Sequence, residues 1–452
     1  MSLPYLLYCL STIFVLKNVN EIVPEPYMDE PFHVPQAQAY CRGEFDVWDP
    51  KITTPPGLYI MSLALKYAFV LKCNISMLRM TVAVTLLGLP LVLTRLLCFH
   101  QRIRARNSFF SPSTEGVVLA SFPIAWFFGF LYYTEVPSLL LVILTFVAAT
   151  NDHHWLASIL GLLSCTFRQN NIIWALYAFA ASMLMEWRFK RPADGAKLYD
   201  PMALEATLGD IFRIVKSAPS VLMDLVKSFV PYTLLIGAFA AFIAWNGGIV
   251  LGDKSNHVPV LHVPQMYYFI GFATAFGWPA LISGNTSIVT LARDVCGRMA
   301  GSMKRACITL VISVAMAFTI WKFTIHHPFV LSDNRHYVFY VWRRIFMLHP
   351  IVPYMLIPAY IACAWAWFLR VGHDQTLLQT ALLPCFTLLA LLPTPLLEPR
   401  YFLIPYIFLR AQLVDLRWWG LLLEAAWYTL INAGTMGVFL YLPREGVGRF
   451  MW

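Results

Sequence analysis

Charged side chains are scarce in this sequence. Asp, Glu, Lys and Arg together make up only 13% of the 452 residues, whereas hydrophobic residues make up 59%. A chain with so little polar surface cannot fold as a water-soluble globular domain. Apolar runs long enough to cross a bilayer recur from one end of the chain to the other, which excludes a soluble domain with a single anchor.

Signals of several other protein classes are also missing. The apolar runs lack the period-two alternation of barrel strands, and no internal repeat, P-loop or dinucleotide-binding fingerprint is present. In lipid every backbone amide must be bonded within the protein, so a helical bundle remains. The nine cysteines show no paired spacing, which argues against a disulfide scaffold or a zinc site; we expect most of them to be small apolar residues within spans.

The sequence therefore predicts an all-α polytopic membrane protein with about 11–14 transmembrane helices. We expect residues 1–452 to form a single membrane-embedded domain. The first apolar run has neither a basic n-region nor a cleavage site, so it is predicted to be a retained helix. The candidate spans are residues 3–23, 77–98, 117–134, 136–150, 155–167, 171–186, 229–250, 265–284, 307–325, 350–370, 376–396, 401–415 and 419–442.

The segment Gly57–Lys72 determines the sidedness of every later span. It is short, carries Lys66 in its middle and follows the stiff Pro55-Pro56 pair, which favours a helix lying in the membrane interface. With that choice the three basic clusters fall on one side, which the positive-inside rule assigns to the cytosol. They lie at residues 102–106, in the predicted cytosolic loop 187–228 and at 293–305. The net charge of +9 then reflects loops facing anionic lipid and calls for no nucleic-acid partner.

Most other polar residues gather in four loops on the opposite, lumenal side. We expect residues 24–76 to form the first lumenal loop, which contains the first of these polar stretches and carries interfacial helices. The four polar stretches are Tyr27–Tyr59, Gly252–Gln265, His326–His349 and Leu397–Tyr406. Acids, histidines and arginines collected at one face of a bundle predict a polar site there.

The first of these stretches reads YMDEPFHVPQAQAYCRGEFDVWDPKITTPPGLY. The others include TFRQNNIIW at 166–174, GDKSNHVPVLHVPQMYYF at 252–269, HPFVLSDNRHYVFYVWRR at 327–344 and LEPRYFLIPY at 397–406. Together they resemble the dolichyl-phosphate-glucose alpha-1,2-glucosyltransferases, which add the last glucose to the lipid-linked oligosaccharide in the endoplasmic reticulum. The resemblance implies a type-C glycosyltransferase bundle, in which an acidic pair ends the first membrane helix and the first lumenal loop carries two interfacial helices.

Transfer from a dolichyl-phosphate sugar needs a carboxylate to accept the proton of the attacking hydroxyl, and cations or hydrogen-bond donors to hold the departing phosphate. Asp29 and Glu30 stand at the lumenal mouth of the first span. The resemblance implies that Asp29 is the base and that Glu30 orients the acceptor or the neighbours of Asp29. In the alternative, Asp29 only caps a helix that begins at Glu30-Pro31.

Residues in the same loops are candidates for substrate binding. A helix starting at Glu30 would place His33 and Gln36 on the face of the acid, although His33 could equally be an interfacial histidine bonded to backbone. Arg400 could instead be locked to Glu398, and Arg343-Arg344 could reach lipid headgroups. The candidates are His33, Gln36, Trp48, Asp49, Lys51, Arg168, Lys254, His262, Arg335, His336 and Arg400. Among the cations we favour His336, Arg335 and Arg400, with Lys254 and His262 next.

No cofactor is expected. The groups Asp253, His257, His262 and His326-His327 lack the ligand count of a defined metal site, and the expected chemistry needs no metal. The resemblance implies a beta-linked donor and an alpha-linked product, hence one displacement with inversion. Two alternatives stay open: a transporter or channel-associated subunit, and a mannosyltransferase that uses dolichyl-phosphate mannose.

Overall fold

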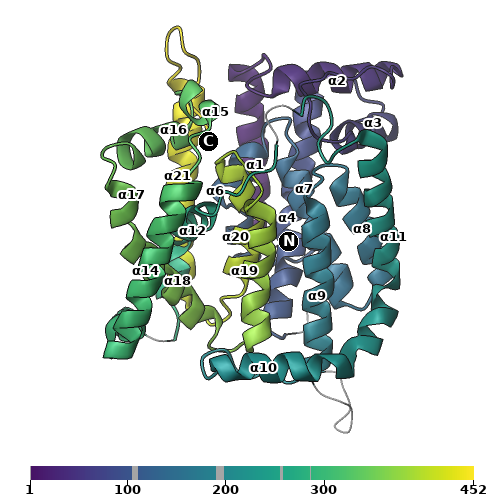
Figure 1. The fold of residues 1–452 in the computed structure, drawn as a ribbon. Coiled ribbons are helices and arrows are strands. Elements are labelled where there is room, and N and C mark those ends of the chain that lie inside the picture. The colour runs from purple at the N-terminus through teal and green to yellow at the C-terminus, as the bar shows by residue number, and fades with distance from the viewer. Residues whose placement is uncertain (1, 104–109, 190–197, 255–257, 286) are drawn as a thin grey trace. The chain divides into compact units, whose positions relative to one another are not determined.

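The computed structural model describes residues 2–103, 110–189, 198–254, 258–285 and 287–452. The regular secondary structure in these ranges is helical, and pairing between extended segments is limited to three isolated bridges (Figure 1). The prediction of an all-α polytopic membrane protein is confirmed. Four described helices are long and apolar enough to cross a bilayer: Ile75–His100, Leu225–Asn246, Met303–Phe323 and Val352–Val371. Shorter apolar helices accompany them.

The chain forms two compact units. The first comprises Met1–Tyr199 and Ile211–Val258, and the second comprises Asp200–Asp210 and Pro259–Trp452. Helices of the first unit are α1 (Leu3–Ile22), α2 (Glu30–Arg42), α3 (Gly57–Phe69), α4 (Ile75–His100), α5 (Thr114–Ala120), α6 (Pro123–Phe128), α7 (Glu135–Thr150), α8 (His154–Cys165), α9 (Asn171–Phe189), η1 (Ala218–Val221) and α11 (Leu222–Asn246). Helix α10 (Leu208–Ser217) has residues in both units.

The core of the first unit is built around α7, which packs against α4, α8 and α9. Helix α4 begins at Asn74, whose side-chain oxygen accepts a hydrogen bond from the Met77 N–H at 2.9 Å. Its 26 residues extend for about 39 Å, which is enough to cross the hydrocarbon core. Helix α2 has Pro31 in its first turn and ends at Gly43 in a left-handed conformation, as a helix with these end signals should.

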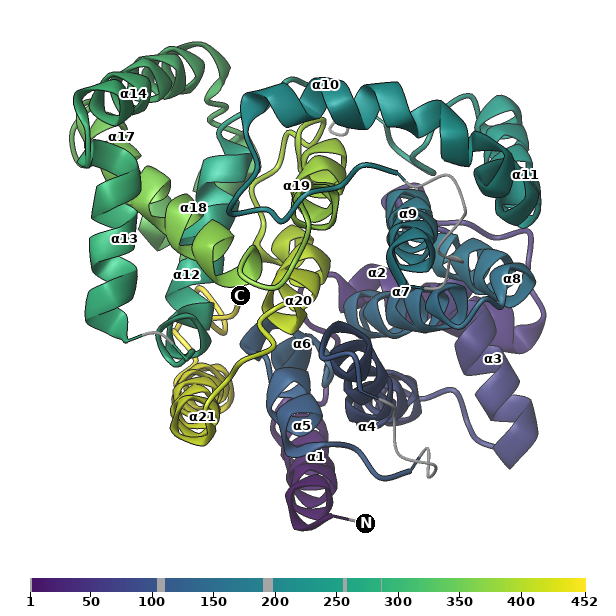
Figure 2. The same ribbon diagram turned by 90° about the horizontal axis from the view of Figure 1, so that it is seen from below.

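Helices α2 and α3 run in other directions than the long helices of their unit. In Figure 1 α2 lies across the direction of α4. In the view from below, α4 is seen end-on while α3 is seen along its length (Figure 2). The helix that the sequence predicts from Glu30 is present as α2, and residues Gly57–Phe69 of the segment Gly57–Lys72 form the 13-residue α3.

The prediction of a continuous span at residues 117–134 is wrong. The chain breaks there into α5 and α6, and residues 129–134 are not helical. Pro123 provides the physical reason, because it lacks an N–H and disfavours helical geometry at the preceding Phe122. Residues 122–139 are buried in the protein, which is where non-helical backbone can exist at membrane depth.

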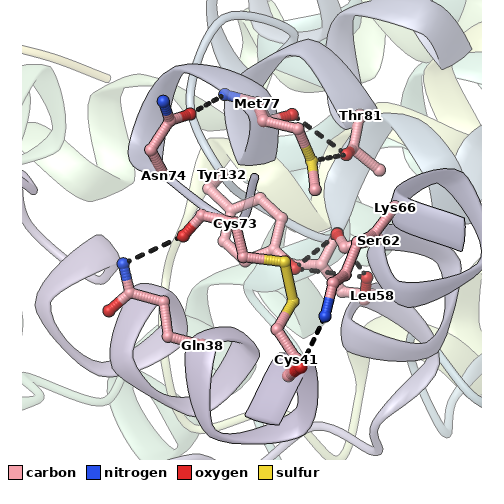
Figure 3. The surroundings of a disulfide bond; sticks show 10 residues. All are labelled: Gln38, Cys41, Leu58, Ser62, Lys66, Cys73, Asn74, Met77, Thr81 and Tyr132. Carbon is pink, nitrogen blue, oxygen red and sulfur yellow. Dashed lines mark hydrogen bonds between the residues drawn. A yellow bond between two sulfur atoms is a disulfide. The ribbon is translucent and has the colours of Figure 1, made fainter. Parts of the chain in front are cut away.

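The spacing of the cysteines argued against a disulfide scaffold, but the structure contains one disulfide. Cys41 and Cys73 form a disulfide that joins the end of α2 to the residue before Asn74 (Figure 3). Two side chains fix the same corner: Gln38 Nε2 donates to the Cys73 carbonyl at 3.2 Å, and Lys66 Nζ donates to the Cys41 carbonyl at 2.6 Å. The 32-residue separation concealed the pair in the sequence, because only the fold brings the ends together.

Replacing Cys41 by Ser is expected to lower the thermal stability of the protein. Opening this 32-residue link should cost about 2–4 kcal/mol, since the unfolded chain regains freedom. The measurement is the midpoint of thermal unfolding in detergent, with Cys98→Ser, at a cysteine that is not disulfide-bonded, as the matched control. Equal midpoints for the two variants would contradict the expectation.

The second unit is an independent helical assembly, in which α12 packs against α18 and α21. Its helices are α12 (Gln265–Ile282), α13 (Ile288–Ala300), α14 (Met303–Phe323), α15 (Pro328–Ser332), α16 (Tyr337–Val341), η2 (Trp342–Phe346), α17 (Val352–Met355), α18 (Ile357–Val371), α19 (Leu377–Leu391), η3 (Pro399–Phe402), α20 (Leu403–Ala411) and α21 (Trp418–Tyr441). A fully buried pair, Arg410 and Glu424, ties α20 to α21. Short helices α15, α16 and η2 occupy the predicted polar loop His326–His349.

Candidate functional site

A fully buried ion pair fixes the acidic dipeptide in the first unit. Arg79, one turn into α4, donates to both carboxylate oxygens of Glu30, at 2.9 and 2.6 Å, and neither side chain is exposed. Glu30 also accepts hydrogen bonds from the backbone N–H groups of Tyr27 and Tyr132 at 3.0 and 2.7 Å. Arg79 reaches further, to the Val23 carbonyl at the end of α1. Glu30 therefore joins the end of α1, the start of α2 and the break before α7.

Asp29 is presented beside this buried pair. The preceding Met28 has a positive φ of 61°, an uncommon conformation for a residue other than glycine. The Asp29 N–H donates to the Tyr133 hydroxyl at 3.0 Å. Asp29 occupies the N-cap position of α2 but makes no side-chain capping bond, and it is partly exposed. The capping role that the sequence left open is therefore not how the structure uses this carboxylate.

The segment Tyr132–Glu135 connects three predicted site residues. Tyr132 and Tyr133 hold Glu30 and Asp29, as described above. The next two residues hold Arg168, whose Nε lies 3.3 Å from the Thr134 hydroxyl and whose Nη2 lies 2.6 Å from a carboxylate oxygen of Glu135. Asp29 and Glu30 lie about 140 residues before Arg168 in the chain. In the structure all three contact the same four-residue segment, Tyr132–Glu135.

In the next turn of α2, His33 contacts a group of aromatic side chains around Tyr59 of α3. His33 Nδ1 is 2.6 Å from the hydroxyl of Tyr59, which is almost completely buried. Burial raises the pKa of Tyr59, so its hydroxyl stays neutral. Trp48 and Tyr40 both meet the Tyr59 ring edge-on, with centroids 6.0 and 5.5 Å away. His33 is therefore bonded to the side chain of Tyr59.

The loop after α2 is shaped by its own polar residues. The buried amide of Gln36 donates to the Val47 carbonyl at 2.7 Å and accepts from the Asp49 N–H at 2.9 Å. Asp49 in turn accepts from the Lys51 N–H at 2.9 Å. The Lys51 ammonium lies over the Phe32 ring in the first turn of α2, at 4.9 Å from its centroid. These contacts favour a shaping role for Gln36 and Asp49 and place the Lys51 cation next to α2.

The two residues before Lys254 contact this loop. The Asp253 N–H donates to the Pro50 carbonyl at 2.7 Å, and Gly252, with φ of 60°, passes so near Pro50 that a side chain there would clash. Lys254 itself is exposed, and its Nζ donates to the Asn246 carbonyl at the end of α11 at 2.5 Å. His257, part of the metal-site alternative, lies outside the described residues. Among the described residues, no group of three potential metal ligands occurs.

In the second unit, Asp333 joins two of the favoured cations. Its carboxylate accepts from Arg335 Nε and Nη2, at 2.9 and 2.7 Å, and lies 3.6 Å from His336 Nε2. Burial by itself raises the pKa of Asp333, but the hydrogen bonds from Arg335 and the nearby His336 hold it below its usual value. All three side chains remain partly exposed. Asp333, Arg335 and His336 therefore form a compact polar cluster in this unit.

Two other predicted cations are engaged locally. Arg400 pairs with Glu398 at 2.6 Å, as the alternative from the sequence anticipated. His262 is completely buried, and burial lowers its pKa to about 4, so it is neutral near pH 7. Its Nδ1 lies 3.3 Å from the Thr394 carbonyl. This environment favours a structural role for His262 over contact with a phosphate.

The C-terminal residues 450–452 pack against the cluster of Asp333, Arg335 and His336. The Met451 N–H donates to the Arg335 carbonyl at 2.8 Å, and His336 Nδ1 lies 2.5 Å from a Trp452 oxygen. The Trp452 ring and the Phe450 ring both contact Tyr337, with centroids 4.6 and 4.5 Å away. Residues 450–452 therefore hold Arg335 and His336 in place.

Deleting residues 450–452 is expected to lower the catalytic efficiency by about 10-fold to 10²-fold, because Arg335 and His336 would lose the contacts that orient them. The measurement is kcat/KM for the dolichyl-phosphate sugar donor that the sequence resemblance implies. Leu442→Ala, an exposed position before the same segment, is the control and should retain activity. Full efficiency in the deletion variant would remove this segment from the site.

Sequence reasoning missed four residues that build the site of the first unit: Arg79, Tyr132, Tyr133 and Glu135. A signal existed for Arg79 and Glu135, because charged residues inside or at the ends of apolar runs are rare and pair with one another. No such signal marks the two tyrosines, since aromatic residues are common in membrane spans.

Comparison with known proteins identifies the family. The sequence model of the DIE2/ALG10 family matches residues 23–411. The chain belongs to this family. It is 33% identical to a human protein named Dol-P-Glc:Glc(2)Man(9)GlcNAc(2)-PP-Dol alpha-1,2-glucosyltransferase, over 100% of this chain and 98% of the relative. Relatives with the same name from Arabidopsis thaliana and Yarrowia lipolytica are 33% and 30% identical, over 96% and 98% of this chain and 96% of each relative. No solved structure matches the chain.

Proposed function

We propose that this protein transfers glucose from dolichyl-phosphate-glucose to the diglucosylated, dolichol-linked oligosaccharide, forming an alpha-1,2 linkage. Full-length similarity to relatives with that activity in their names supports the substrate pair. The observation that carries the proposal is the gathering of Asp29, Glu30 and Arg168 on the segment Tyr132–Glu135. Such an arrangement provides a partly exposed carboxylate on a rigid support, which a base for proton removal requires.

In the proposed reaction, a hydroxyl of the acceptor attacks the anomeric carbon of the glucose. The new carbon–oxygen bond forms as the bond to the phosphate oxygen breaks, and the electron pair leaves with dolichyl phosphate. Asp29 accepts the hydroxyl proton. A single displacement inverts the configuration, so a beta-linked donor gives an alpha-linked product. Dolichyl phosphate is already a good leaving group, so the reaction calls for no metal or other cofactor.

Cations must stabilise the charge that grows on the departing phosphate. Lys51 and Arg168 are candidates in the first unit, because Lys51 lies over the first turn of α2 and Arg168 is anchored on the segment that holds Asp29. Arg335 and His336 are candidates in the second unit, where both are partly exposed. Glu30 acts through its neighbours, because its carboxylate is buried and surrounded by donors.

We place the reaction at the lumenal face of the endoplasmic reticulum membrane. The disulfide Cys41–Cys73 supports this side for residues 24–76, because disulfides persist in oxidising compartments such as that lumen. The basic clusters at 187–228 and 293–305 support a cytosolic location for the opposite loops. Asn285-Thr286-Ser287 is therefore expected to remain unglycosylated, and a glycan there would contradict this orientation. Absence of a glycan at Asn74-Ile75-Ser76 would decide little, because that acceptor lies close to the membrane.

The deciding experiment incubates the purified full-length protein with the diglucosylated acceptor and either dolichyl-phosphate-glucose or dolichyl-phosphate-mannose. Mass spectrometry should find an acceptor one hexose heavier with the glucose donor alone. Transfer from the mannose donor alone would indicate the mannosyltransferase alternative. Transfer from neither donor by folded protein would overturn the enzymatic proposal and favour the transporter alternative.

A further inference from the structure

Helix α10 is oriented with its apolar side outward. Its first turn is closed by Asp210, which accepts hydrogen bonds from both the N–H and the hydroxyl of Thr207, at 2.9 and 2.7 Å. At its other end, the Ser217 hydroxyl accepts from the Tyr199 N–H at 2.9 Å. Asp210 is buried and Ser217 is half-buried. The polar side of the helix therefore faces its own chain.

The apolar side is exposed instead. Leu208, Ile211, Phe212 and Val215 follow the spacing of one helix face, and their exposed fractions are 83%, 48%, 80% and 67%. An amphipathic helix on a soluble protein packs its apolar face against the core. In α10 the apolar face is exposed and the polar face is turned toward the protein. Apolar residues of this size gathered on one exposed helix face indicate an interaction surface.

Two basic residues border that face on one side. Lys216 and Arg213 are both exposed, and Arg213 lies over the Tyr199 ring at 5.7 Å from its centroid. On the helix they come next to Phe212, between the apolar face and the inner face. An outward apolar face with a basic border fits the boundary between acyl chains and anionic headgroups.

The direction of α10 agrees with such a location. It runs across the direction of α9 and α11 in Figure 1, and the view that shows α9 end-on shows α10 along its length (Figure 2). A helix across the spans lies along a bilayer surface rather than through it. It is separated by only four residues from α11, whose first residues Leu222 and Met223 are also exposed.

We propose that α10 is a membrane-surface helix, with Leu208, Ile211, Phe212 and Val215 inserted among lipid acyl chains and with Arg213 and Lys216 bound to anionic lipid phosphates. The surface lies in the loop 187–228, so it faces the cytosolic leaflet if the orientation proposed above holds. The inference does not depend on the glucosyltransferase activity, because it rests on the faces of one helix.

Photo-crosslinking of the full-length protein in nanodiscs tests this inference. A photoreactive phenylalanine analogue placed at position 212 or 215 should form adducts with phospholipid acyl chains. The same analogue at position 213, on the basic border, should give far fewer. Position 318, an exposed site within α14, provides the positive control for lipid adducts. Adducts to another protein, or no lipid adduct at 212 and 215 while position 318 reacts, would overturn the proposal.

The charge requirement is tested in the same system. Nanodiscs of phosphatidylcholine alone are compared with nanodiscs that also contain phosphatidylserine. In the R213E/K216E double variant, the gain in adducts at position 212 caused by phosphatidylserine should fall by about fivefold or more. An unchanged gain would remove the anionic-lipid part of the proposal. The midpoint of thermal unfolding, measured on the same samples, shows whether the variant remains folded.

Discussion

Asp29→Asn is expected to lower the glucosyl-transfer turnover by about 10²-fold to 10⁴-fold while leaving the fold intact. The amide keeps the size of the side chain but cannot accept the proton of the attacking hydroxyl. The fold should persist, because the side chain makes no capping bond and the backbone of this residue is held by Tyr133. The measurement is single-turnover transfer from dolichyl-phosphate-glucose, alongside the midpoint of thermal unfolding.

Glu44→Gln is the matched control for this variant. Glu44 is a carboxylate in the same loop, paired with Arg42 at an exposed position beyond the end of α2. Its removal should leave transfer and thermal midpoint nearly unchanged. Near-normal turnover by folded Asp29→Asn protein would exclude Asp29 as the base and direct attention to the other carboxylates of the loop.

Arg79→Met should be the most destabilising single change at the site. It would leave the Glu30 carboxylate buried without its charged partner, at a cost of about 3–5 kcal/mol. The end of α1 would also lose the hydrogen bond that Arg79 makes to the Val23 carbonyl. We expect a large fall in the midpoint of thermal unfolding, together with loss of transfer.

Two further variants separate the buried pair from a general effect of losing an arginine. Arg42→Met breaks the exposed pair with Glu44 and should change the midpoint little. The double variant Arg79→Met/Glu30→Gln removes the uncompensated charge, so it should be more stable than Arg79→Met alone. It should still transfer glucose slowly, because the ionic link that steadies the turn before α2 is gone. A double variant no more stable than the single one would contradict this account.

The sequence predicted helix boundaries and ion pairs between near neighbours in the chain better than it predicted contacts between distant residues. The local start signal Glu30-Pro31 correctly placed the beginning of α2, and the neighbouring Glu398 correctly suggested a partner for Arg400. Residues two or three apart along the chain are close in any fold, so such pairs are accessible to sequence reasoning. The pairing of Glu30 with Arg79 spans 49 residues, and nothing in either local pattern selects the other.

The interruptions on either side of α6, at residues 121–122 and 129–134, also could not be predicted from local sequence. The apolar residues at 117–134 predicted one continuous span. All of residues 122–134 are buried in the structure, both the helical and the non-helical ones, so hydropathy could not distinguish the two. Pro123 was visible in the sequence, but a proline inside a membrane helix can be tolerated, as Pro90 in α4 shows. Pro123 explains the interruption before α6, and the contacts of Tyr132 and Tyr133 with the acidic pair hold the non-helical stretch at residues 129–134.

Composition and the length of the apolar runs by themselves determined that this chain is a helical membrane protein, because burial in lipid depends on local hydropathy and on backbone hydrogen bonds within each helix. The motifs fixed which residues are candidates for chemistry. Tertiary structure alone decided that Cys41 meets Cys73, that Arg79 neutralises Glu30, and that Tyr132–Glu135 holds Asp29 and Arg168. Those contacts join segments that lie tens of residues apart, so their energies are set by packing between helices and leave no periodic trace in the sequence.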